Sequence, residues 1–249
     1  MIGVMGTVGI IDRALLEAGT PERAEHERRY LKSDLVHYGV GIPDIRRITR
    51  AALARAGGLA HRDLMELIET LWSIPVHERR MAAVEVASAR LRDLSVDDLG
   101  LLESMLRQAH TWALVDPLAI GVVGPLLDRH PHAADAVLDR WADDDDFWIR
   151  RSALLAHLAA LRTGGGNWDR FCRHADAMLD EREFFIRKAI GWVLRDTARK
   201  RPDLVYEWIL PRAERASGVT LREAVKRLSP TQAAAVMERS RRGARSGGP

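Results

Sequence analysis

The strongest candidate for chemistry in this sequence is a tryptophan followed four residues later by an aspartate. Residues at this spacing lie on one helix face, so Trp112 and Asp116 would present an indole ring and a carboxylate side by side. Both groups stabilise positive charge, and a carboxylate can also position or deprotonate a water molecule. On residue types alone, core packing is favoured for the tryptophan, and a helix cap before Pro117 is favoured for Asp116.

Basic side chains gather in one stretch of the chain. The formal net charge is only +3, so the distribution of charge matters more than its total. Between residues 182 and 201, only Glu183 and Asp196 oppose the basic residues Arg182, Arg187, Lys188, Arg195, Arg199, Lys200 and Arg201. Arginine keeps its charge and makes planar two-point contacts with phosphate, so this stripe favours a polyanionic partner.

Several classes of site are disfavoured by the sequence. A single cysteine, Cys172, excludes an internal disulfide and a cysteine-based zinc site. The pair His77-Glu78 lacks a second histidine four residues after the first, so the zincin pattern fails, and no glycine loop of the phosphate-cradling type is present. We therefore predict neither a metal ion nor a cofactor.

The elements that must position these residues are short helices. Apolar residues recur at spacings of three and four, as in Leu64, Leu67, Ile68 and Leu71, while alternating strand patterns are missing. A pattern of arginine, any residue, small residue and apolar residue returns at Arg80, Arg150, Arg187 and Arg222, at intervals that fit a period of about 35 residues. Stacked helical hairpins of the HEAT type have such a period. The predicted fold is an all-α, right-handed α-solenoid of HEAT-like repeats with a concave face.

One instance of the repeat is missing, and its place is informative. Near residue 115 the chain reads Trp112-Ala113-Leu114-Val115-Asp116-Pro117, so Asp116 takes the position that Arg151 and Lys188 hold elsewhere. Equivalent positions of successive repeats line up on one surface, which predicts a carboxylate in a row of basic side chains. The repeated arginines themselves, Arg150 and Arg187 among them, could contact DNA or form salt bridges between helices, and the sequence leaves both alternatives open.

Domain organisation and location follow from composition. We predict a single domain over residues 1–238, followed by a disordered basic tail over residues 239–249, which has nothing to bury. No window approaches the length of a membrane span, and the first 16 residues lack the basic start of a secretory signal. The protein is expected to be cytoplasmic, soluble and monomeric.

Four segments of the chain resemble the AlkD-like DNA alkylation repair family. They are Tyr30-Leu31-Lys32, residues 112–116, Phe147-Trp148-Ile149-Arg150-Arg151 and the long segment from Phe184 to Arg195, and the resemblance spans roughly residues 22 to 228. It implies a HEAT-like solenoid whose concave face binds duplex DNA and excises cationic N3- and N7-alkylated purines, without a metal or nucleotide cofactor. It also implies excision without extruding the base, unlike pocket-based glycosylases.

The resemblance also assigns roles to individual residues. Asp116 matches the family's catalytic carboxylate, while Trp112 and Trp192 match the aromatic walls around the deoxyribose of the lesion. Arg151 matches an arginine that binds phosphate, and Tyr30 an aromatic placed near the opposite strand. We further expect Arg187, Lys188, Arg195 and Arg199 to hold the flanking phosphates.

One departure and two alternatives accompany this assignment. The family often carries a second aromatic residue immediately before the first tryptophan, and here that neighbour is Thr111, so the substrate range could differ. No lysine in this segment stands out as a Schiff-base nucleophile, which predicts a monofunctional glycosylase without strand cleavage. The competing hypotheses are a noncatalytic HEAT scaffold that binds DNA or protein, and a family member that binds DNA without excision.

Overall fold

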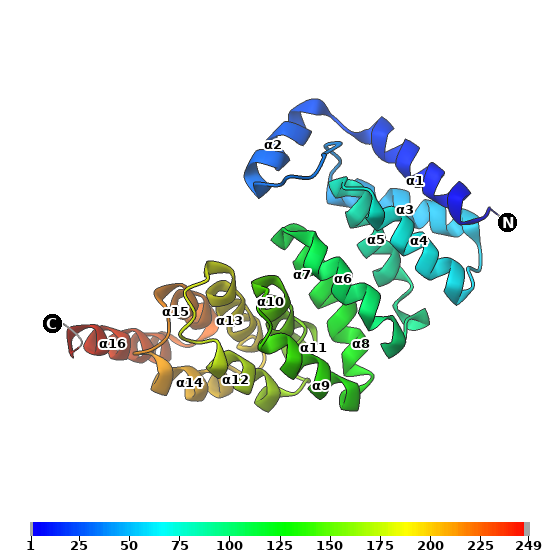
Figure 1. The fold of residues 1–249 in the computed structure, drawn as a ribbon. Coiled ribbons are helices and arrows are strands. Elements are labelled where there is room, and N and C mark those ends of the chain that lie inside the picture. The colour runs from blue at the N-terminus through cyan, green and yellow to red at the C-terminus, as the bar shows by residue number, and fades with distance from the viewer. Residues whose placement is uncertain (1, 247–249) are drawn as a thin grey trace. The chain divides into compact units, whose positions relative to one another are not determined.

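A computed structural model describes residues 2–246, and most of them lie in short helices (Figure 1). In chain order the first helices are α1 (Val4–Ala18), α2 (Pro21–Leu31), α3 (Ile42–Ala56), α4 (His61–Ser73), α5 (His77–Ala89), η1 (Leu91–Asp93), η2 (Val96–Asp98), α6 (Leu99–Ala109) and α7 (Trp112–Leu118). They continue with η3 (Ala119–Val123), α8 (Gly124–Asp128), α9 (Pro131–Ala142), α10 (Phe147–Leu155), α11 (Leu158–Thr163), α12 (Trp168–Ala177), α13 (Phe184–Thr197), α14 (Pro202–Ile209), η4 (Leu210–Arg212), α15 (Gly218–Ala224), η5 (Val225–Arg227) and α16 (Pro230–Ser246). An isolated bridge between Val36 and Val76 is the nearest approach to a strand within the described residues, so the all-α prediction is confirmed.

The contacts divide the chain into two compact units, Met1–Leu118 and Ala119–Pro249. A division of contacts does not test whether the units fold independently. The single domain over residues 1–238 therefore stays a prediction. Each unit is described by itself below.

Helix α5 is the centre of the first unit. Every residue from His77 to Val84 is buried, and α1, α3 and α4 pack against this helix. Its buried arginines have partners: Arg79 forms an ion pair with Asp12 at 3.0 Å, and Arg80 donates to the backbone oxygens of Trp72 and Gln108. Buried charge is tolerated when it is paired and hydrogen-bonded, so these contacts join α5 to α1, α4 and α6.

Helix α13 takes the corresponding central place in the second unit. It packs against α10, α11 and α15, and its apolar face contributes Ile186, Ile190 and Val193 to the core. Four tryptophans of the described residues are buried, namely Trp72, Trp141, Trp148 and Trp208, and a fifth, Trp168, packs against the core while partly exposed. These indoles fill volume between helices, as expected for core residues.

The repeat register predicted from the sequence is present in the helices. Arg80, Arg150 and Arg187 are each the fourth residue of their helix, in α5, α10 and α13, respectively. Asp116 is the fifth residue of α7, as Arg151 is of α10 and Lys188 is of α13. Asp116 therefore occupies a position that two other helices fill with a cation.

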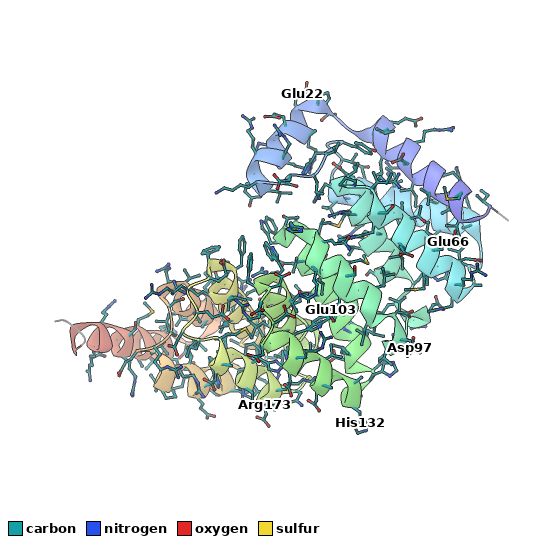
Figure 2. All side chains as sticks on the ribbon, in the orientation of Figure 1. Glu22, Glu66, Asp97, Glu103, His132 and Arg173 are labelled. Carbon is teal, nitrogen blue, oxygen red and sulfur yellow. The ribbon has the colours of Figure 1, made fainter. Side chains whose placement is uncertain are left out.

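Ion pairs between residues one repeat apart connect successive hairpins of the second unit. Asp135 pairs with Arg170 at 2.9 Å, and Asp176 pairs with Arg212 at 2.5 Å. In the same way Asp139 accepts a hydrogen bond from His174, and Asp180 pairs with Arg215. In the first unit, the labelled Glu22, Glu66 and Asp97 are exposed on the surface (Figure 2).

Side-chain caps mark where α10, α12, α13 and α15 of the second unit begin. Asp146 accepts from the backbone nitrogen of Trp148 at 2.8 Å, and Asn167, Glu183 and Ser217 cap α12, α13 and α15 in the same way. The acidic run 143–146 thus ends in an N-cap, which satisfies backbone donors that have no partner within the helix.

The basic tail differs from its prediction. Residues 239–246 continue α16, and Arg239 lies 3.2 Å from Glu214 in an ion pair, so the expectation of disorder is wrong for this part. The physical reason is that Val236, one turn earlier, is fully buried and anchors the helix on the unit. Residues 247–249 lie outside the described residues.

Candidate functional site

Trp112 and Asp116 both lie in α7, a short helix that is followed by a π-helical turn. Thr111 precedes its first residue, and its side chain accepts a 3.4 Å hydrogen bond from the backbone nitrogen of Ala113. Pro117 lies inside the helix and has no amide hydrogen, and a π-helical turn, η3, follows directly in the chain. Such turns appear mostly as single insertions within helices, frequently at functional sites.

Asp116 lies inside α7 rather than before it. The interpretation of Asp116 as a helix cap is therefore wrong, because a cap precedes the first helical residue. Its side chain is buried, with 7% of the residue exposed. Thr111 supplies the cap instead, which gives this departure from the family pattern a structural role.

Tyr30 and Trp112 meet in the first unit, although they lie far apart in the sequence. Their rings form an edge-to-face pair with centroids 6.0 Å apart and planes at 87°. Tyr30 is 67% exposed and also lies parallel to the ring of His26. A largely exposed aromatic ring beside a tryptophan can contact a base or a sugar, whereas a core residue could not.

Helix α13 presents a second group of candidate residues. Lys188, Trp192 and Arg195 lie at spacings of four and three and therefore share one face of the helix. Glu223, from α15, pairs with Lys188 at 2.5 Å and also with Arg195 and Lys226. Burial raises the pKa of Glu223, but the hydrogen bonds and charges of these cations outweigh burial and lower the pKa to about 2.

A glycine allows α13 and α15 to approach closely enough for this pairing. A Cβ atom at Gly191 would lie 2.9 Å from the backbone oxygen of Thr220 and 2.7 Å from the Cβ of Glu223. No other residue type fits there without moving α15. Gly191 thus sets the position of Glu223 against Lys188.

Arg151 lies among aromatic rings of the second unit. It donates to the backbone oxygen of Phe185, and its guanidinium carbon is 5.6 Å from the centre of the Phe185 ring, which in turn packs on Trp148. Only 2% of the residue is exposed. The side chain is held rigidly, and its contact with phosphate stays a prediction.

The repeated arginines contact residues of their own or of the next repeat. Arg150 pairs with Glu181 at 2.9 Å and donates to the backbone oxygen of Asp144, while Arg187 donates to the backbone oxygen of Glu181 at 2.6 Å. These contacts support the structural alternative that the sequence left open for both residues. Lys188 and Arg195 remain the better candidates for phosphate contact on α13.

The family model described as "DNA alkylation repair enzyme" matches residues 11–228. The chain belongs to this family. None of the curated proteins matches it. Among solved structures, it is similar to a predicted DNA alkylation repair enzyme from Enterococcus faecalis, at 24% identity and a TM-score of 0.76, with 85% of this chain and 97% of that chain covered.

Two further structures share the fold of this DNA alkylation repair protein. AlkD2 from Streptococcus mutans is 17% identical, with a TM-score of 0.59 and coverage of 83% and 99% of the two chains. The protein smu.31 from the same species is 16% identical, with a TM-score of 0.58 and coverage of 76% and 93%. At these identities the likeness establishes the fold alone.

The site residues of this family member divide between the two units. Trp112, Asp116 and Tyr30 belong to the first, while Trp192, Arg151, Lys188 and Arg195 belong to the second. Their assembly into one site stays a prediction. Sequence reasoning missed Glu223, although it lies one repeat after Lys188 and carries the opposite charge, which is the signal that could have identified it. No helix within residues 2–246 is long and apolar enough to cross a membrane.

Proposed function

We propose that this DNA alkylation repair enzyme is a monofunctional glycosylase that removes positively charged N3- and N7-alkylated purines, such as 3-methyladenine and 7-methylguanine, from duplex DNA. The observation that carries the proposal is Asp116, a buried carboxylate that shares α7 with Trp112. It stands where α10 and α13 have a cation. The match to the DNA alkylation repair family supports DNA as the substrate.

The chemistry requires little more than a carboxylate. An alkylated purine carries a positive charge, so when the glycosidic bond breaks, the base takes the bonding electrons and leaves neutral without a general acid. The sugar becomes oxocarbenium-like, and Asp116 stabilises this cation and orients a water molecule towards C1′. The water oxygen forms the new bond to C1′ and gives up its proton to the Asp116 carboxylate, which leaves an abasic site. No cofactor enters these steps.

The aromatic and basic residues have supporting roles in this proposal. Trp112 and Trp192 flank the cationic nucleoside, for which indole rings are the best aromatic partners. Arg151, Lys188 and Arg195 hold phosphates, and Tyr30 contacts the opposite strand. Recognition depends on charge and backbone shape, so it requires neither a base sequence nor extrusion of the lesion from the duplex.

The test compares cationic with neutral lesions in otherwise identical duplexes. We expect release of 7-methylguanine and 3-methyladenine, detected by strand breakage at the abasic site after mild alkali, and no release of uracil or 8-oxoguanine. Equal rates for neutral and cationic lesions would contradict the proposed chemistry. Binding of every duplex without release of any base would leave the DNA-binding scaffold as the function.

A further inference from the structure

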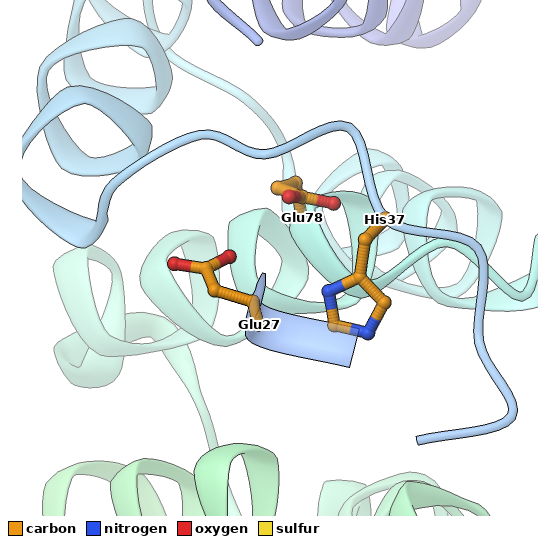
Figure 3. A group of neighbouring side chains, drawn as sticks. All are labelled: Glu27, His37 and Glu78. Atoms are coloured by element: carbon orange, nitrogen blue, oxygen red, sulfur yellow. The ribbon is translucent and has the colours of Figure 1, made fainter. Parts of the chain in front are cut away.

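Three potential metal ligands from separate segments meet in the first unit (Figure 3). Glu27 comes from α2, Glu78 from the buried helix α5, and His37 from the segment between α2 and α3. Their candidate ligand atoms all lie within 4.8 Å of one another. None of these residues takes part in the proposed excision, so the cluster requires its own explanation.

The histidine of this cluster has unsatisfied nitrogens. Both ring nitrogens of His37 are buried, and neither has a hydrogen-bond partner among the described residues. A buried polar atom without a partner destabilises the fold, and a bound ion removes this cost by taking the place of the partner. Burial lowers the pKa of His37 despite the opposing effect of Glu78 and Glu27, and the neutral ring has a lone pair to offer a metal.

Hydrogen bonds and an ion pair hold the two carboxylates of the cluster in position. Glu78 accepts hydrogen bonds from the backbone nitrogens of Tyr38, Gly39 and Val40 at 2.9, 2.7 and 3.2 Å. Glu27 forms an ion pair with Arg23 through Oε1 at 2.7 Å. Within the described residues no cation pairs with Glu78, whose negative charge is fully buried. A metal ion would supply the missing positive charge.

Helix α2 gives the cluster a structural purpose. None of its residues from Pro21 to Leu31 is buried, so apolar packing contributes little to its attachment. The segment between α2 and α3 is attached to α5, because the backbone nitrogen of His77 donates to the backbone oxygen of Val36 at 2.9 Å. A metal bridging Glu27 to His37 and Glu78 would tie α2 to this rigid part, and with it the exposed ring of Tyr30.

We propose that Glu27, His37 and Glu78 form a binding site for a divalent transition metal of the zinc class. One imidazole nitrogen with carboxylate oxygens favours Zn²⁺ and its neighbours over Mg²⁺ or Ca²⁺, which prefer oxygen ligands alone. Bonds of about 2.0–2.1 Å in tetrahedral geometry separate ligand atoms by about 3.4 Å, so ligand atoms that now lie within 4.8 Å of one another would approach by up to about 1.4 Å. A cavity of about 690 Å³ includes His37, Arg28 and Asp34 in its lining and so borders one of the three proposed ligands. A water molecule would complete a four-coordinate site.

The test is direct metal binding by the full chain after removal of metal with a chelator. Titration with Zn²⁺ by calorimetry and with Co²⁺ by visible absorption is expected to give one ion per chain, with the spectrum of a four-coordinate mixed nitrogen and oxygen site. His37→Phe, which keeps a ring beside His77, and Glu27→Gln should each weaken binding at least 10-fold. Mg²⁺ and Ca²⁺ at equal concentration should not displace Co²⁺.

Matched controls lie on the same helix. His26→Phe and Glu25→Gln change the same residue types at exposed positions of α2 and should leave the affinity unchanged. The proposal is overturned if the wild-type chain binds neither ion at micromolar concentration. It is equally overturned if His37→Phe and Glu27→Gln bind as tightly as their controls, since the ion would then be held elsewhere.

Discussion

Helices α7 and α13 share one repeat register but use it for different chemistry. In α7 the fifth residue is the carboxylate of Asp116, and the helix ends after two further residues at the π-helical turn. In α13 the fifth residue is Lys188, and the helix is uninterrupted over its full length of 14 residues. The charge of Lys188 is already opposed by Glu223, which lies one repeat further along the chain.

The difference shows what a repeat determines and what it leaves open. The register determines which position of a helix a residue occupies, and the apolar positions maintain the stack. The residue type at the fifth position then sets the sign of the charge there. It is a cation paired with Glu223 in α13, and in α7 it is a carboxylate, to which we assign a cationic substrate. Both sides of this comparison can be tested separately.

The largest effect on stability is expected from removing the carboxylate that pairs with Lys188. Glu223 has its pKa lowered from 4.5 to about 2, so it contributes stability that is fully present above pH 4.5 and is lost as the pH falls through 2. Glu223→Gln should therefore lower the free energy of unfolding at pH 7 by up to about 3 kcal/mol and leave it nearly unchanged at pH 2. Denaturant unfolding across this pH range measures the difference.

An exposed glutamate of the same unit provides the control for this variant. Glu207→Gln removes an equal charge from the surface of α14 and should change stability by less than about 0.5 kcal/mol. If Glu223→Gln is as stable as this control at pH 7, the ion pair between Lys188 and Glu223 does not contribute to stability. The contrast between the two helices would then fail.

A smaller loss of stability is expected where α13 meets α15. Gly191→Ala places a methyl group 2.9 Å from the oxygen of Thr220, which should cost about 2 kcal/mol and lower Tm by about 4–8 °C. Gly100→Ala in α6 has no neighbouring atom within 4 Å, so its Tm should stay equal or rise slightly. Calorimetry of both variants checks the prediction, and equal Tm values would show that the close approach is not required.

The helical fold and its register could be predicted from the sequence because both depend on local patterns. Apolar spacing identified the helices, and the recurring arginine aligned Asp116 with Arg151 and Lys188. The tail was mispredicted because a few apolar residues such as Val236, followed by many charges, give little local signal of burial. The ion pair of Arg239 with Glu214 is a tertiary contact that composition does not reveal.

Side-chain partnerships were the part that the sequence did not predict. The roles of Arg150 and Arg187 were left open because a repeated arginine has the same pattern whether it contacts phosphate or a nearby backbone oxygen. The cluster of Glu27, His37 and Glu78 was missed because its members come from three segments with no characteristic spacing. Only the folded chain brings such residues together.

The most direct test of Asp116 as the catalytic carboxylate is the excision of 7-methylguanine by Asp116→Asn under single-turnover conditions, with protein in excess over a duplex that carries one lesion. We predict a rate at least about 100-fold below wild type, because the charge that stabilises the sugar cation is lost, while affinity for the duplex stays within a few-fold. Asp97→Asn, an exposed aspartate of the same unit, should keep the wild-type rate. An Asp116→Asn protein that releases the base as fast as this control would contradict the central role assigned to the carboxylate.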